Sequence, residues 1–287
     1  MASLSGSLAA APSRAGRIAK TFERLRGAGV AGFVPFIMAG DPDLATTLDL
    51  MRVACAAGAD LIELGVPFSD PMADGPVLQR SAERALAAGT MLPGVLETVA
   101  RFRADSDVPV ILFGYANPFL HYGLERLACD GAKSGADGVL CVDMPPEEAD
   151  ELKVATDRAG LDLIFLVAPT TDRTRLQRVL AHACGFVYCV SITGVTGAAA
   201  PVAVEVSAMV RAVKARTELP VGVGFGIRDP AQAAEVARIA DAVVVGSAVM
   251  RLVEEHTGSA LLDVAHDFLR CMAAAVHAAR VESGGKS

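Results

Sequence analysis

Several patterns that mark particular classes of protein are missing from this chain of 287 residues. No basic cluster stands out and the net charge is -7, so we expect no nucleic-acid partner, because phosphate-backbone binding needs a concentrated basic face. The six cysteines include no CxxC pair, and the five histidines show no HxxxH spacing. These absences argue against a bound metal and favour buried, reduced thiols of a cytosolic protein.

The sequence also shows no pattern typical of a secretory signal or a membrane-spanning helix. The first fifteen residues, MASLSGSLAAAPSRA, are small and polar without the apolar core of a secretory signal. We expect residues 1–15 to form a disordered tail. The uncharged window 183–204 contains Gly185, Gly194, Gly197 and Pro201, which make a poor membrane helix. The expectation is a soluble, cytoplasmic protein.

What the sequence does contain is a regular alternation of short apolar runs and helical patterns. Runs that are apolar at nearly every position are typical of strands covered on both faces, as in parallel sheets. Eight such β-rich runs occur, at Phe33–Met38, Asp60–Val66, Val108–Phe113, Gly138–Val142, Asp162–Val167, Gly185–Ser191, Val221–Gly224 and Ala242–Val245. Patterns with one apolar face predict helices at Leu44–Ala57, Leu92–Phe102, Glu125–Ser134, Glu147–Ala159, Arg173–His182, Val202–Arg216, Ala231–Ile239 and Ala260–Val281.

Eight β-then-α units in roughly 250 residues predict a single (β/α)8 TIM barrel, the α/β fold that requires this alternation. An extra N-terminal helix around Ile18–Arg26 would close the bottom of the barrel. A doubly wound open sheet is the alternative, but no GxGxxG follows the first strand. No interdomain linker is evident, so residues 16–287 are predicted to form one catalytic domain.

Candidate site residues follow from the barrel, because its working residues lie at the carboxyl ends of strands and in the loops after them. Glu63 stands inside an apolar run near the end of the second strand, and Asp74 lies in the proline-bounded loop that follows. Tyr115 follows the third strand, Asp143 follows the fourth, and Tyr188 lies in the sixth.

The last two strands end in glycine motifs, GFGI at 224–227 and VGSA at 245–248. Glycines let the backbone approach a ligand, and Ser247 can cap a helix whose N–H groups face an anion. This location is the common phosphate site of such barrels. The loop SITGVTGAAAP before them is rich in Gly and Thr and is a candidate mobile lid.

Each feature also has a purely structural interpretation. Glu63 could pair with a barrel arginine, because buried charges are usually paired. Asp74 before Gly75 and Pro76 is ordinary turn chemistry, and Tyr115 and Tyr188 could be core rings with satisfied hydroxyls. The two glycine motifs on adjacent strands, preceded by the Gly/Thr loop, are a stronger signal than any single residue.

Taken in order, these motifs resemble those of the tryptophan synthase α subunit family. They are FVPFIMAGDPD at 33–43, LIELGVPFSDPMADGP at 61–76, GYANP at 114–118, DMPPEE at 143–148, GVTG at 194–197, GFGI and VGSA. The stretch ELGVPFSDPxADGP is highly specific to that family. The resemblance implies cleavage of indole-3-glycerol phosphate to indole and glyceraldehyde 3-phosphate, with no cofactor in this subunit.

The resemblance also implies a role for each matching residue. Glu63 would be the acid/base group, Asp74 would bind the indole N–H and stabilise the charge on the protonated ring, and Tyr188 matches a tyrosine near the catalytic glutamate. Substrate-binding matches are Phe36, Tyr115, Leu140 and Phe225 around the indole, Gly197, Gly226, Gly246 and Ser247 around the phosphate, and Thr196 on the lid. The chain departs from the family pattern at Met38, at Phe113 and in the uncharged lid.

Family members bind a β subunit that carries pyridoxal phosphate, usually in an αββα tetramer. The matching docking surface would include Pro67–Pro71 and the loop Asp143–Pro146. Two other functions stay open from the residues alone. Another phosphosugar barrel enzyme would need a lysine or a second strong base at a strand end, and no lysine stands there. A subunit that only activates its partner would not need both Glu63 and Asp74.

Overall fold

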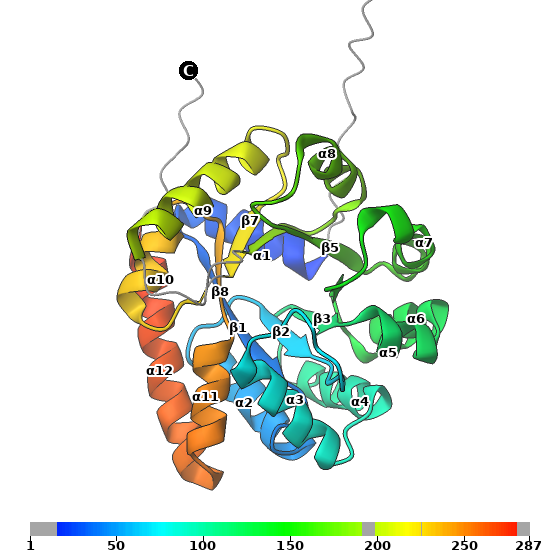
Figure 1. The fold of residues 1–287 in the computed structure, drawn as a ribbon. Helices are drawn as coiled ribbons and strands as arrows, with labels where there is room; N and C mark the ends of the chain where they lie inside the picture. The colour runs from blue at the N-terminus through cyan, green and yellow to red at the C-terminus, as the bar shows by residue number, and fades with distance from the viewer. Residues whose placement is uncertain (1–15, 191–198, 225, 280–287) are drawn as a thin grey trace, which may run out of the picture.

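The computed structural model describes residues 16–190, 199–224 and 226–279 of the chain (Figure 1). Eight parallel strands close into a barrel in sequence order, and the last pairs with the first. They are β1 (Gly32–Met38), β2 (Ile62–Gly65), β3 (Val110–Gly114), β4 (Gly138–Cys141), β5 (Asp162–Val167), β6 (Val187–Val190), β7 (Val221–Gly224) and β8 (Ala242–Val245). The predicted TIM barrel is confirmed, and the closed sheet excludes the open-sheet alternative.

Helices surround this barrel on its outer face (Figure 1). They are α2 (Leu44–Ala56), α3 (Pro76–Ala87), α4 (Leu92–Arg103), α5 (Ala116–Tyr122), α6 (Leu124–Ser134), α7 (Asp150–Ala159), α8 (Arg173–His182), α9 (Ala199–Lys214), α10 (Pro230–Ala237), α11 (Ser247–Glu255) and α12 (Gly258–Ala278), with a 3-10 turn at Pro146–Glu148. Helices α3 and α5 were not among those predicted. The buried face of α3 is Ser81, Ala82 and Ala85, too small and polar to show a hydrophobic period, and α5 has seven residues.

Alternate strand residues point into the barrel and outward beneath the helices. The interior cluster includes Leu61, the residue before β2, together with Ile111, Leu140 and Ile164. Ile62, the next residue along the chain, belongs instead to the cluster that packs under the helices. Because Glu63 follows Leu61 by two positions, the strand period of two directs Glu63 inward as well. The carboxyl group of Glu63 therefore lies among apolar side chains in the barrel interior.

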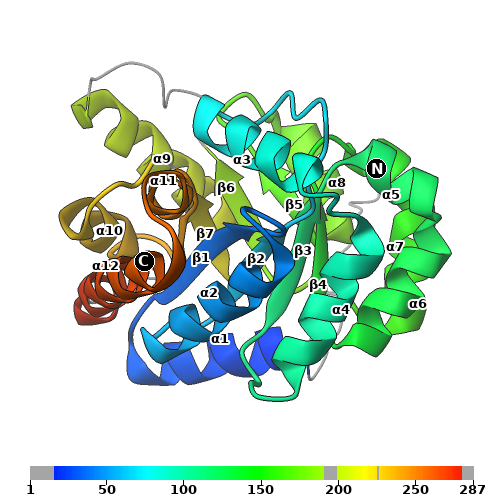
Figure 2. The same ribbon diagram turned by 90° about the horizontal axis from the view of Figure 1, so that it is seen from below.

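Helix α1 (Arg17–Ala28) closes one end of the barrel, as the sequence predicted. Its buried residues Ile18, Phe22 and Leu25 belong to the same cluster as the strand interiors. The Phe22 ring lies 5.7 Å from the ring of Phe186. Figure 2 shows α1 at one end of the barrel and α3 at the other. The carboxyl ends of the strands therefore open on the side away from α1.

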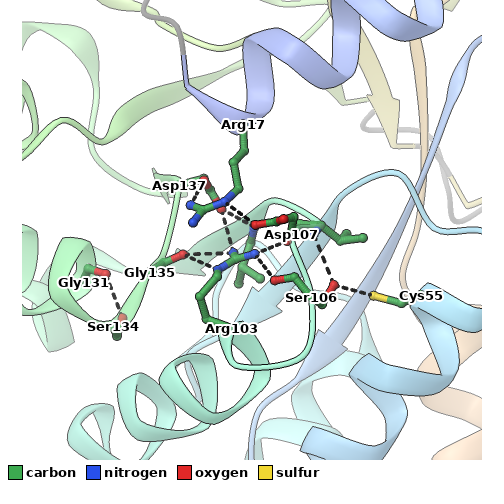
Figure 3. A network of polar contacts seen from close by, with 11 residues as sticks. Arg17, Cys55, Arg103, Ser106, Asp107, Gly131, Ser134, Gly135 and Asp137 are labelled. Carbon is green, nitrogen blue, oxygen red and sulfur yellow. Dashed lines mark hydrogen bonds and ion pairs between the residues drawn. The ribbon is translucent and has the colours of Figure 1, made fainter.

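Polar groups at the closed end are tied together by aspartates that precede strands. Asp137, before β4, accepts a hydrogen bond from the backbone N–H of Val110 at 2.9 Å and pairs with Arg17 and Arg103 on two sides (Figure 3). Two other aspartates accept equivalent backbone bonds, Asp60 from Phe33 and Asp241 from Val221. This end of the barrel is therefore built for stability, as is usual for the fold.

Three further observations bear on the expectations from sequence. Over the ranges that the structure describes, no helix combines the length and apolarity needed to cross a bilayer. Within the same ranges, no three His, Cys, Asp or Glu side chains converge where they could hold a metal ion. The predicted tail at residues 1–15 lies outside the described part of the chain.

Candidate functional site

Glu63 is completely buried in the barrel interior and pairs across the β1–β2 ladder with Phe36. Among the described residues, neither Oε1 nor Oε2 has a hydrogen-bond partner. No arginine of the described residues pairs with the Glu63 carboxyl. Within these residues, the interpretation of Glu63 as half of a buried ion pair is therefore wrong. Burial disfavours the charged form and raises the pKa of Glu63 to about 8. At neutral pH this group is a protonated acid.

Asp74 lies half-buried in the loop between β2 and α3. Burial raises the pKa of this carboxyl to about 6, and a hydrogen bond from Tyr115 opposes the rise. Asp74 is therefore ionised at neutral pH, the opposite state to Glu63. Two carboxyl groups whose environments separate their pKa values are the arrangement that supplies one acid and one anion in a single site.

The loop around Asp74 is held on both sides by short contacts. The Asp74 N–H donates to the Pro71 carbonyl at 3.0 Å, and Gln79 Nε2 donates to the Asp74 carbonyl at 2.9 Å. The first bond closes a turn within the loop, and the second ties the backbone of Asp74 to the first turn of α3. Sequence reasoning missed Gln79, because no local pattern indicates which backbone carbonyl its amide reaches.

Tyr115, the residue after β3, holds the same loop from the other side. Its hydroxyl accepts a hydrogen bond from the Ala73 N–H at 3.2 Å and donates one to the Asp74 carboxylate. Its ring packs against Phe68, with centroids 5.4 Å apart. Tyr115 was predicted as a pocket-lining residue, and the structure adds that it contacts the aspartate itself.

Tyr188 lies in β6 on the inner wall of the barrel. Burial, followed by the charges of Glu63 and Asp74, raises the pKa of its hydroxyl well above the ordinary value. The hydroxyl therefore stays protonated and acts only through hydrogen bonds. Gly224 on β7 leaves room for it, because a Cβ at Gly224 would collide with the Tyr188 hydroxyl.

Apolar side chains next to Glu63 form a wall suited to an aromatic ligand. The Phe36 and Phe113 rings meet edge to face, with centroids 5.2 Å apart, which is a favoured geometry for aromatic pairs. Phe113 is in turn the ladder partner of Leu140 on β4, and Leu140 is fully buried. A Cβ at Gly65 would stand 2.5 Å from Phe36 Cζ. A larger residue at position 65 would therefore collide with the Phe36 ring.

The glycine motifs after β7 and β8 each show one local backbone feature. Gly226 has a φ of +45°, in the left-handed region that favours glycine. The N-cap of α11 is Gly246, whereas Ser247 is its first helical residue, so the expectation that Ser247 caps the helix is wrong. The first N–H groups of a helix lack intrahelical acceptors and carry the positive end of its dipole. This end of α11 therefore suits an anion.

Asp143, which follows β4, lies close to Tyr115, because its charge, after burial and the charge of Asp74, helps raise the pKa of the Tyr115 hydroxyl. Asp143 is exposed, and its Oδ1 accepts a hydrogen bond from the Ala116 N–H at 2.7 Å, which fixes the start of α5. Thr196, Gly197 and Phe225 lie outside the described residues. The structure thus brings Glu63, Asp74, Tyr115 and Tyr188 together, with Phe36 and Leu140 on the adjoining wall.

Comparison with known proteins gives consistent matches. The family model "Tryptophan synthase alpha chain" matches residues 22–277. A tryptophan synthase alpha chain of Citrifermentans bemidjiense is 54% identical over 256 residues, covering 89% of this chain and 96% of the relative. That of Geobacter sulfurreducens is 55% identical over 245 residues, covering 85% and 93%. The crystal structure of tryptophan synthase subunit alpha from Legionella pneumophila str. Paris shares 40% identity with a TM-score of 0.85, covering 91% and 98% of the two chains.

Proposed function

The chain belongs to the tryptophan synthase alpha chain family, and we propose that Glu63 and Asp74 carry its reaction. The protein is a lyase of tryptophan biosynthesis that cleaves indole-3-glycerol phosphate to indole and glyceraldehyde 3-phosphate. A different phosphosugar reaction and a purely activating role, both open from the residues alone, are thereby excluded. The observation that supports the assignment of the two residues is their different surroundings: Glu63 is fully buried without a hydrogen-bond partner among the described residues, whereas Asp74 is half-buried beside the Tyr115 hydroxyl.

Glu63 would serve as both acid and base in one cycle. The protonated carboxyl delivers its proton to C3 of the indole ring, which makes the ring an electron sink. The resulting carboxylate removes the proton of the C3′ hydroxyl, the bond between C3 and C3′ breaks, and its electron pair returns to the ring as the aldehyde forms. The acid is restored at the end of the cycle. A pKa of about 8 is close enough to neutral pH for both transfers.

Asp74 would accept the indole N–H and stabilise the positive charge that develops on the protonated ring. A fixed anion aimed at growing charge is electrostatic preorganisation, which requires no rearrangement at the moment of reaction. The hydrogen bond from Tyr115 supports this anion. The charges of Glu63 and Asp74 both raise the pKa of the Tyr188 hydroxyl. Tyr188 would donate a hydrogen bond within the same site.

Substrate binding would divide between the two ends of the ligand. Phe36, Tyr115, Leu140 and Phe225 are proposed to line the indole, and Gly197, Gly226, Gly246 and Ser247 the phosphate, with Thr196 meeting Asp74 on lid closure. Backbone amides and the start of α11 would allow a chain of net charge -7 to hold a phosphoester without a basic patch.

The proposed partner is a β subunit that carries pyridoxal phosphate, in an αββα tetramer in the cytoplasm, with no cofactor in this subunit. Residues 16–287 would act as one catalytic domain behind a disordered tail at 1–15. The proposed docking surface includes Pro67–Pro71 and Asp143–Pro146. Met72, which follows the first of these segments, is a large apolar side chain that is 93% exposed, and this supports docking there. If adding a β subunit left turnover unchanged, this partnership would not hold.

Indole release from indole-3-glycerol phosphate tests the assignment, with purified parent protein and Glu63→Gln, each alone and with a β subunit. We expect slow release by the parent, faster release with the β subunit, and loss of release in the variant by a factor of about 10²–10⁴, the usual contribution of a general acid or base. Unchanged release by folded Glu63→Gln would assign the proton transfers to another group.

A further inference from the structure

We infer that Arg84 is a positioning residue for Asp74, and that it acts by locking α3 to the end of β1 and to α11. The inference rests on the proposed role of Asp74. Helix α3 begins at Pro76, with Gly75 as its N-cap, directly after Asp74. Gln79 of its first turn also holds the Asp74 carbonyl. The position of Asp74 is therefore coupled to that of α3, and contacts that fix α3 also fix the Asp74 carboxylate.

The first anchor of α3 is Asp41, in the segment between β1 and α2. Its side chain is completely buried and receives Arg84 Nε at 2.8 Å on Oδ1 and Arg84 Nη2 at 2.7 Å on Oδ2. Ser81 Oγ donates to Oδ2 at 2.5 Å. A bidentate guanidinium–carboxylate fork fixes orientation as well as distance, so α3 is held to the barrel in one direction.

The second anchor is Glu254, at the end of α11. Arg84 Nη1 lies 3.6 Å from Glu254 Oε1, and Arg80 Nε and Nη2 donate to its two oxygens at 2.6 and 2.8 Å. Arg80 and Arg84 are one turn apart, so they lie on the same face of α3. The two helices pack against each other along this face.

These two anchors join the two ends of the proposed site. Helix α11 begins at Ser247, where the phosphate would bind, and α3 begins beside Asp74, where the indole N–H would bind. Arg84 contacts a carboxylate on each side of α3. Loss of its fork would let α3 tilt, and a displacement of about 1 Å in a group that stabilises the transition state can cost on the order of 10²-fold in rate.

A double-mutant cycle between Arg84 and Asp74 tests the inference. Arg84→Lys keeps a charge beside the buried Asp41 while removing the fork, so the protein should fold; thermal unfolding confirms that before kinetics. We expect Arg84→Lys to lower kcat for indole-3-glycerol phosphate about tenfold in the parent, and by less than about twofold in Asp74→Asn, because it acts through Asp74. The KM and the inhibition constant of inorganic phosphate should change by less than about twofold.

Arg52→Lys is the control with the same substitution, because Arg52 Nε and Nη2 both donate to Oδ2 of the exposed Asp105, away from α3, and the loss of this contact should leave kcat unchanged. Equal losses in both backgrounds, or no loss in either, would overturn the inference about Arg84. If Asp74→Asn alone left kcat unchanged, the proposed role of Asp74 would be wrong, and the inference would fall with it.

Discussion

Tyr115 donates a hydrogen bond to the carboxylate of Asp74, from the end of β3 to the loop that follows β2. This bond works against burial, which by itself raises the pKa of Asp74. Glu63 has no such donor among the described residues, and burial alone raises its pKa to about 8. The pKa of Asp74 reaches about 6. Between these values the site holds an acid and an anion at the same time.

The pH dependence of kcat/KM, which reports groups of the free enzyme, should therefore be bell-shaped. Below about pH 6 Asp74 becomes protonated and no longer stabilises a cation, and above about pH 8 Glu63 loses the proton that it must deliver. Indole release measured from pH 5 to 9 at substrate concentrations well below KM tests this. A value of kcat/KM that keeps rising up to pH 9 would contradict the assignment of Glu63 as the acid.

Tyr115→Phe separates the Asp74 limb from any titration of the substrate phosphate. The substitution removes the bond that lowers the pKa of Asp74, so the acidic limb should move to higher pH while the basic limb stays. Tyr122→Phe is the matched control, because the Tyr122 hydroxyl donates to Asp130 on the outside of the barrel. An acidic limb unmoved in Tyr115→Phe would assign that limb to the substrate.

Gly224→Ala should displace Tyr188 without altering any polar group. A Cβ at this position would collide with the Tyr188 hydroxyl, so the ring must shift, and we expect kcat to fall by about tenfold or more. Gly222→Ala on the same strand is the control, since its Cβ would stand 3.1 Å from Phe186 and needs only a small adjustment. Equal kinetics in the two variants would mean that the Tyr188 position is unimportant.

Arg103→Leu should reduce stability and spare catalysis. The Arg103 guanidinium donates to the carbonyls of Ser106, Val108 and Gly135 and to Asp137 (Figure 3). Its removal leaves Asp137 with Arg17 as its cationic partner and takes this donor from three carbonyls, which costs about 1–3 kcal/mol for each buried group left unsatisfied. Urea unfolding checks the loss.

For the same variant, kcat measured well below the unfolding transition should match the parent, because the network lies at the closed end of the barrel. Arg126→Leu, on an exposed ion pair, should change the free energy of unfolding by less than about 1 kcal/mol. A fall in kcat of folded Arg103→Leu would show that the closed end influences the site.

Sequence patterns predicted the barrel well because its strands are covered on both faces. The run Ala242–Val245 is apolar throughout and coincides with β8, and Glu63 stood out because it interrupts such a run. The contact between Asp41 and Arg84 could not be predicted, because it joins residues far apart in the chain and depends on how α3 packs. The same holds for the Tyr115 hydroxyl, whose partner is chosen by the fold of the loop after β2.

Glu63 should also make the stability of the protein depend on pH. Its pKa rises on folding from 4.5 to about 8, so between these values the unfolded chain has lost a proton that the folded chain keeps. Unfolding then releases a proton, and stability falls as pH rises through this window, by up to about 1.4 kcal/mol per pH unit. Below pH 4.5 both states are protonated, and the penalty is absent.

Glu63→Gln removes this dependence, because an amide of the same shape does not titrate. We expect the free energy of unfolding of Glu63→Gln to exceed that of the parent by an amount that grows from pH 5 to 8 and levels off above pH 8. Urea unfolding at each pH measures the difference, with Glu97→Gln at an exposed position of α4 as the control that should follow the parent. Parallel curves for Glu63→Gln and the parent would mean that the buried carboxyl is ionised in the folded protein, and that it could not begin the reaction as an acid.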